Sequence, residues 1–144
     1  MRKVSTDRFG ELEIDEKRVL HFNEGIPAFE TEHEFIILPY DDESPYYFMQ
    51  SLNKSNLAFL LTMPELFFPD YAAEIDDETV AELEIAEDDN VLIYTLLTIP
   101  NGSVRYMTAN LLAPIVINVK NMKAKQIVMD KSNYTTKHRL FPDK

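Results

Sequence analysis

The sequence predicts an all-β, mainly antiparallel domain, folded as a small β-barrel-like or sandwich structure with one short capping helix. Apolar and β-branched runs recur about every 8–12 residues and are separated by turn residues, a spacing typical of sandwiches and barrels. Only residues 76–85 show a clear helical pattern. The 144 residues fit one domain without a linker, so we expect a single unit over 1–144, with a basic tail at 135–144.

The first half of the chain is expected to supply six strands. They run over Lys3–Thr6, Glu11–Ile14, Arg18–Phe22, Glu34–Leu38, Tyr46–Leu52 and Leu57–Thr62. The first two flank a short loop ending in Gly10, where a positive φ favours glycine, and should form a hairpin. In the fifth, residues alternate between the two faces, so Tyr46 and Phe48 lie opposite Tyr47 and Met49.

The second half is expected to hold the helix and the remaining strands. Asp76 is a good N-cap for a helix ending near Ile85, and the stripe of Val80 and Leu83 must pack to hold so short a helix. Further strands are predicted over Asn90–Ile99, Ser103–Thr108, Pro114–Lys120 and Lys125–Asp130, with a type I′ turn at Asn101-Gly102. Residues 134–144 are unpatterned, and the tail is either docked or disordered.

Charge is unevenly distributed along the chain. The formal net charge is -11, and residues 41–90 hold fourteen acidic side chains and a single basic one, Lys54. Residues 91–144 instead hold eight basic and two acidic side chains. An acidic segment repels nucleic acid and attracts a basic protein, although such runs more often serve only as a solvated surface.

The residue types that carry catalysis and metal binding are poorly represented. The chain has no cysteine, and its three histidines lack metal-ligand spacing. The acidic clusters Asp41–Glu43 and Glu87–Asp89 lack the ligand spacing of a calcium loop. We therefore expect no enzyme, no catalytic residue, no metal and no cofactor. Without a signal peptide or a membrane-spanning run, we expect a soluble, cytoplasmic protein that is monomeric when free.

Two apolar segments are candidates for binding another protein. Leu66, Phe67, Phe68 and Tyr71 lie beside the acidic helix and either fill the barrel mouth as core or line an apolar groove rimmed by acids. Such a groove would receive an amphipathic helix with basic flanks. Ile26 and Phe29, held by a Gly-Ile-Pro turn, either plug the fold beneath their loop or face a partner.

Four stretches of this sequence closely resemble the FliW family of flagellar assembly factors. They are GIPAFE (25–30), LAFLLTMPELFFPDY (57–71), TANLLAPIVIN (108–118) and KQIVMDKSNYTTKH (125–138). The resemblance implies a β-barrel-like fold and a non-catalytic protein that binds two partners in competition. These partners are CsrA, a basic dimeric RNA-binding protein that represses flagellin translation, and flagellin, whose terminal helices are amphipathic.

Under that resemblance we assign contacts to both partners, with no direct nucleic-acid contact and no membrane. For CsrA we expect the acidic residues Asp76, Asp77, Glu78, Glu82, Asp41, Asp42 and Glu43. For helix docking we expect Ile26, Phe29, Leu66, Phe67, Phe68 and Tyr71. Asn110 joins these partner-binding candidates; its alternative is a turn residue that tolerates left-handed φ or satisfies its own turn. The rival hypothesis is a small-molecule-binding β-barrel or a carboxylate-dependent barrel enzyme, which an internal pocket of ~300–1,000 Å³ would support.

Overall fold

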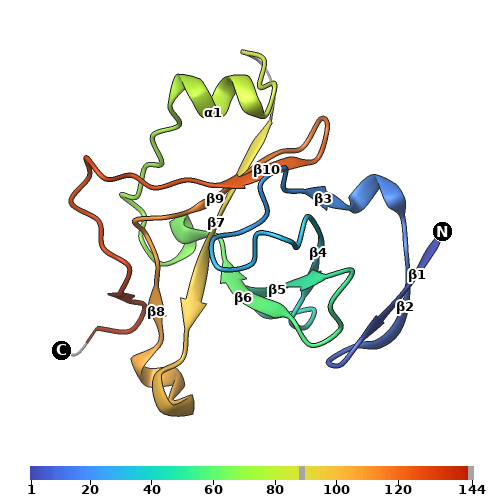
Figure 1. Ribbon diagram of the computed structural model, residues 1–144. Coiled ribbons are helices and arrows are strands. Elements are labelled where there is room, and N and C mark those ends of the chain that lie inside the picture. The colour runs from blue at the N-terminus through green and yellow to red at the C-terminus, as the bar shows by residue number, and fades with distance from the viewer. Residues whose placement is uncertain (88–89, 143–144) are drawn as a thin grey trace.

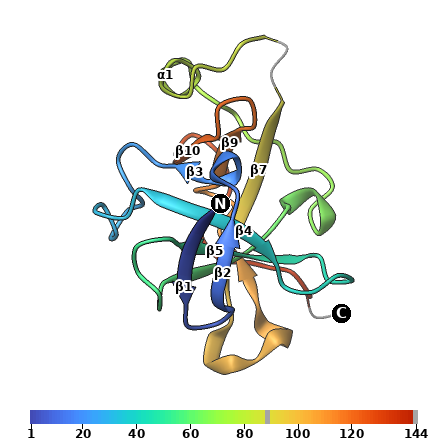
Figure 2. The ribbon, with the colours of Figure 1, turned by 90° about the vertical axis from the view of Figure 1, so that its right-hand side faces the viewer.

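The computed structural model describes residues 1–87 and 90–142. Its strands close into a ring (Figures 1 and 2). Around the ring, each strand pairs with the next in the order β7, β6, β5, β4, β3, β10 and β9, and β9 pairs back to β7. Every pairing is antiparallel except β3–β10, a parallel contact of one register pair, Lys123 with His21. This narrow seam makes the structure a ring of sheet rather than a true barrel. The ring strands are β3 (Leu20–His21), β4 (Glu34–Pro39), β5 (Tyr46–Ser51), β6 (Ala58–Thr62), β7 (Val91–Thr98), β9 (Ile115–Asn118) and β10 (Lys123–Gln126).

Alternating side chains of the ring strands fill its interior. Phe35, Met49, Leu61 and Ile115 are buried there. The loop between β3 and β4 adds Phe22 and Ile26 to the same cluster. The prediction that Tyr47 and Met49 share one face of β5 is confirmed, because both pack into the interior cluster.

The outer face of the ring is covered by separate segments. The hairpin of β1 (Arg2–Thr6) and β2 (Gly10–Ile14) packs Val4 and Ile14 against Ile36 of β4, with the short 3-10 helix η1 (Glu16–Arg18) following it. On another side lie β8 (Thr108–Ala109), β11 (His138–Arg139) and the 3-10 helix η2 (Pro64–Leu66). The mainly antiparallel all-β class with one short helix is therefore confirmed.

The helix α1 (Asp77–Glu82) does not cap an open end of the ring. Leu83, just after it, packs with Val116 of β9, whose neighbours Ile115 and Ile117 point into the ring. Consecutive strand residues point to opposite faces, so α1 covers the outer face of β9. Both views place it over β9 and β10 (Figures 1 and 2). Among the described residues, no helix is long and apolar enough to cross a membrane.

Two predicted strands differ from the structure, and the tail takes one of its two expected states. The expected return strand Ser103–Thr108 is replaced by the 3-10 helices η3 (Pro100–Gly102) and η4 (Val104–Tyr106), and only Thr108 and Ala109 pair with β7. The last hairpin strand lies earlier than predicted, at Lys123–Gln126, because the turn comes at residues 119–122. The tail is docked: β11 pairs with β8 and Leu140 is buried.

Candidate protein-binding surfaces

The acidic loop Asp41–Glu43 connects β4 to β5 and is held in a defined shape. One carboxylate oxygen of Asp41 accepts a hydrogen bond from the backbone N–H of Glu43 at 2.9 Å. The hydroxyl of Thr62 donates to the carbonyl of Pro45 at 2.8 Å and anchors the end of the loop to β6. All three acidic side chains are exposed, and no cation of the described residues forms an ion pair with them.

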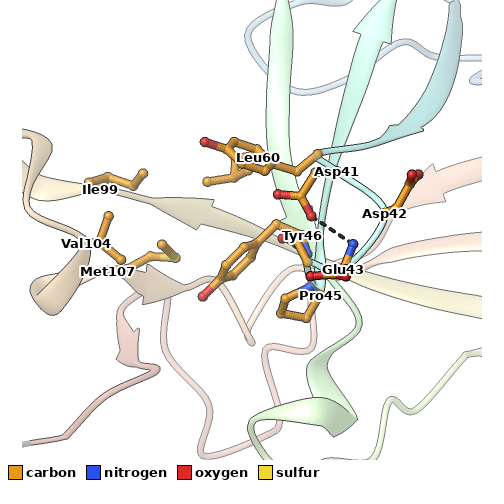
Figure 3. Close-up of a pocket in the computed structure, with 11 residues that line it drawn as sticks. Asp41, Asp42, Glu43, Pro45, Tyr46, Leu60, Ile99, Val104 and Met107 are labelled. Carbon is orange, nitrogen blue, oxygen red and sulfur yellow. Dashed lines mark hydrogen bonds between the residues drawn. The ribbon is translucent and has the colours of Figure 1, made fainter.

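Beside this loop lies an open apolar groove of about 730 Å³ (Figure 3). Its apolar wall comes from three separate segments: Leu60 of β6, Ile99 at the end of β7, and Val104 and Met107 around η4. Figure 3 shows the ring of Tyr46 lying between the acidic loop and these apolar side chains. The groove is thus apolar along one wall and acidic along the other, which suits an amphipathic helix with basic residues on one flank.

The acidic helix α1 presents fewer free charges than the sequence suggests. Asp76 caps the helix, since its carboxylate accepts the Thr79 N–H at 2.8 Å. Hydrogen bonding by the Thr79 side chain, and secondarily by its backbone N–H, lowers the pKa of Asp76. Glu82 pairs with Lys125 of β10 at 2.8 Å. This partner raises the pKa of Lys125. Asp77 and Glu78 are exposed.

A second ion pair and two amides fix the end of α1 to the sheet. Glu84 pairs with Lys123 of β10. The side-chain amides of Asn118 and Asn121 both donate to the carbonyl of Leu83 at 3.0 Å. Lys123 and Lys125 therefore already form ion pairs within the molecule, with acidic residues at and just beyond the end of α1.

The aromatic segment Leu66–Tyr71 is mostly packed, which agrees with its core interpretation. Phe67 and Phe68 are half-buried, and Phe67 stacks on Tyr46 with ring centroids 6.0 Å apart. The hydroxyl of Tyr71 donates to the carbonyl of Leu111 at 2.8 Å. Burial, and secondarily the neighbouring Tyr134, raise the pKa of Tyr71 to about 12. Leu66 differs, being 56% exposed.

The tail lies against this aromatic segment. Phe141 meets Phe67 edge-on at 5.8 Å, and His138 meets Phe68 at 6.1 Å. The aromatic segment is thus covered by the chain's own C-terminal residues on one side and joined to the groove through Tyr46 on another.

Ile26 and Phe29 separate into two roles. Ile26 is 2% exposed and belongs to the ring interior, so its side chain cannot meet a partner in this structure; the plug interpretation holds for it. Phe29 is half-buried, edge-on to Phe59 at 5.6 Å. Backbone hydrogen bonds between Ile26 and Phe29 close the loop in both directions.

Asn110 sits where its structural alternative places it. Its side-chain oxygen accepts the N–H of Ala113 at 3.0 Å, and its carbonyl accepts the hydroxyl of Thr95 at 2.8 Å. It is half-buried and lies outside the groove lining. Of the second acidic cluster, Asp88 and Asp89 lie outside the described residues. Within residues 1–87 and 90–142, no three His, Cys, Asp or Glu side chains gather as metal ligands.

A second pocket, of about 370 Å³, opens at one end of the ring interior. It is lined by Arg18, Leu20, Ile37, Pro39, Tyr47, Leu92, Tyr94, Ile117, Val119 and Met122. Its volume falls within the range of ligand sites, ~300–1,000 Å³, which the small-molecule hypothesis requires.

Sequence reasoning found the acidic half of the groove and missed its apolar half. Ile99, Val104 and Met107 were assigned to a strand and its hairpin partner, with no sign that they would face Asp41–Glu43.

Comparison with known proteins gives consistent matches over nearly the whole chain. The model of the FliW protein family matches residues 3–140. The flagellar assembly factor FliW of Geobacillus sp. (strain WCH70) is 43% identical over 142 residues, covering 99% of this chain and 97% of that protein. FliW of Heliobacterium modesticaldum is 45% identical over 140 residues, covering 97% and 91%. A crystal structure of the flagellar assembly factor FliW superposes with a TM-score of 0.91 at 41% identity, covering 98% of each chain.

Proposed function

The chain belongs to the FliW family, and on that premise we propose that it regulates flagellar assembly in the cytoplasm by binding CsrA and flagellin. It acts by occupancy rather than by catalysis. While flagellin occupies the protein, CsrA is free to repress flagellin translation. When flagellin is exported, the freed protein captures CsrA and translation resumes.

The observation that carries the proposal is the apolar groove flanked by the acidic Asp41–Glu43 loop. An amphipathic helix buries its apolar face against Leu60, Ile99 and Met107. Basic residues on the flank of that helix meet carboxylates that have no ion-pair partner among the described residues. Both partners draw on the same features, since flagellin ends in amphipathic helices and CsrA is basic.

Within the acidic segment, the loop is a stronger site for a basic partner than α1. Glu82 and Glu84 already face Lys125 and Lys123, so a basic partner would have to compete with an internal cation. Asp77 and Glu78 stay exposed and extend the negative surface. Steering by exposed charges raises the association rate and is screened over about 8 Å at physiological salt.

Only some of the apolar residues predicted to dock a helix are accessible to a partner. Phe29 and Leu66 are the members of the predicted docking set with exposed or half-exposed side chains that are neither covered by the tail nor plugged into the ring. They extend the surface available to flagellin beyond the groove.

Titration calorimetry against CsrA of the same organism, at low and moderate salt, tests the proposal. The key variant carries Asp41→Asn, Asp42→Asn and Glu43→Gln; asparagine at 41 keeps the oxygen that accepts the Glu43 N–H. The matched control carries Asp7→Asn, Glu11→Gln and Glu13→Gln on the exposed β1–β2 hairpin and changes net charge equally.

We expect salt-sensitive CsrA binding that the loop variant weakens by about tenfold or more and the hairpin variant changes little, because charge-assisted contacts contribute ~1.5–3 kcal/mol each. Equal weakening by both variants would assign the effect to net charge alone. No binding of CsrA at either salt concentration would refute the proposed partner.

A further inference from the structure

The second pocket, at the end of the ring, has no part in the function proposed above. It is apolar along most of its wall, with Leu20, Ile37, Leu92 and Ile117 supplying side chains from four different strands. Its volume of about 370 Å³ corresponds to roughly twelve water molecules at the ~30 Å³ each occupies in the liquid. It therefore has room for a ligand of about ten non-hydrogen atoms.

Two tyrosine hydroxyls supply polar groups to this wall. Tyr47 and Tyr94 meet edge-on with ring centroids 5.7 Å apart, and neither hydroxyl has a hydrogen-bond partner among the described residues. Tyr94 is 6% exposed. Neither hydroxyl is among the fully buried unsatisfied atoms of the described chain, so both oxygens are accessible and can donate to an acceptor that enters the pocket.

The Tyr94 hydroxyl acts as a donor rather than as a charged group. Burial, and secondarily the nearby Tyr47, raise the pKa of Tyr94. Tyr94 therefore keeps its proton at neutral pH and can donate to an oxygen.

Arg18 adds a cation to the same pocket. It lies at the end of η1, with an exposed side chain, and forms no ion pair within the described part of the chain. Glu16, in the same turn, pairs with Arg2 at 3.6 Å instead. The chain has a formal net charge of -11, so the positive charge of Arg18 beside this pocket is opposite in sign to the charge of the protein as a whole.

We propose that this pocket binds a small carboxylate with an apolar body, such as a medium-chain fatty acid. The apolar body lies among Leu20, Ile37, Leu92 and Ile117, and the carboxylate accepts hydrogen bonds from Arg18 and the tyrosine hydroxyls. Guanidinium binds carboxylate in a planar, two-bond geometry that a neutral headgroup cannot match.

The test is a titration of the full chain followed by NMR of its backbone amides and Leu and Ile methyl groups. The probe is octanoate, and 1-octanol is the matched neutral ligand. The variant is Arg18→Gln, and the control is Lys17→Gln, which removes the same charge from the neighbouring residue of η1 and whose side chain does not line the pocket.

Octanoate is expected to shift the NMR signals of the pocket methyl groups saturably. Arg18→Gln should weaken octanoate binding by about tenfold, whereas Lys17→Gln should leave it nearly unchanged. Binding of 1-octanol should respond to neither variant. The proposal is overturned if octanoate causes no saturable shift at millimolar concentration, or if Arg18→Gln and Lys17→Gln behave alike.

A second variant tests the hydroxyl. Tyr94→Phe keeps the aromatic ring and removes one donor, and it is expected to weaken octanoate severalfold without changing 1-octanol. A Tyr94→Phe protein that binds octanoate as tightly as the unchanged chain removes that hydroxyl from the site.

Discussion

Replacing Gly25 with alanine tests how the loop between β3 and β4, which carries Ile26 into the ring interior, is built. Gly25 has φ +68, a left-handed conformation that costs an L residue about 1–2 kcal/mol. A Cβ added there would lie 2.5 Å from the carbonyl oxygen of Glu30 and 2.7 Å from its carbonyl carbon. These are backbone atoms, so the loop itself must move to accept the substitution.

Gly10 is the matched control, because it shares the conformation without the close approach. Its φ is +70, and nothing lies within 4 Å of an added Cβ. Alanine also reduces the entropy of the unfolded chain, which offsets ~0.4–1 kcal/mol of the strain. Gly10→Ala should therefore cost about 1 kcal/mol, whereas Gly25→Ala adds the ~1–3 kcal/mol typical of forcing extra atoms into a packed region.

Urea unfolding followed by circular dichroism measures the difference directly. We expect Gly25→Ala to lower the free energy of unfolding by about 2–4 kcal/mol, with an unchanged dependence on urea, and Gly10→Ala by about a third as much. Equal destabilisation by the two substitutions would mean that the approach to Glu30 carries no energetic weight, and the argument for a tightly closed loop would fail.

Two further substitutions test burial and ionisation. Ile26→Ala should lower the free energy of unfolding by about 2–5 kcal/mol because it opens a cavity in the ring interior, whereas Leu66→Ala should change it by no more than ~0.5 kcal/mol. If urea unfolding showed no change for Ile26→Ala, Ile26 would again be a candidate for contact with a partner. Tyr71→Phe should cost about 1 kcal/mol at neutral pH, since it loses the hydrogen bond to Leu111. Because the folded pKa of Tyr71 is raised to about 12, its contribution is complete below pH ~10 and is lost as pH rises toward 12. Between pH 9 and 12, the free energy of unfolding should therefore fall less steeply for Tyr71→Phe than for the unchanged chain. Parallel curves of this free energy against pH would contradict the assignment.

Local patterns in the sequence predicted most of the strands because β-rich apolar runs and the turn residues between them mark strands directly. The alternation of Tyr46 through Ser51 gave the correct two faces, since one face packs into the ring and the other into outer clusters. Asp76 was correctly identified as a helix cap from its own chemistry and position. Such features depend on neighbours within a few residues, which the sequence displays directly.

Features that depend on distant pairing were not predictable in this way. Asn101 and Gly102 both adopt positive φ, as a tight hairpin turn requires, yet the chain continues into η4 and pairs again only at Thr108. The pairing of Glu82 with Lys125 joins residues 43 positions apart and depends on α1 lying over the outer face of β9. The groove likewise forms only because the ring brings β6, the end of β7 and η4 beside the Asp41–Glu43 loop.

The two candidate sites can be tested separately because they use opposite faces of the same strand. Tyr46 lines the groove on the outer face of β5, and Tyr47, the next residue, lines the ring pocket on the inner face. Consecutive strand residues point in opposite directions, so a substitution at one tyrosine removes no contact from the other site. Loss of CsrA binding on changing Asp41–Glu43 should therefore leave octanoate binding intact, and Arg18→Gln should spare CsrA. If either variant weakened the binding of both ligands, the cause would be a change in β5, the strand that the two sites share, rather than the loss of the charges themselves.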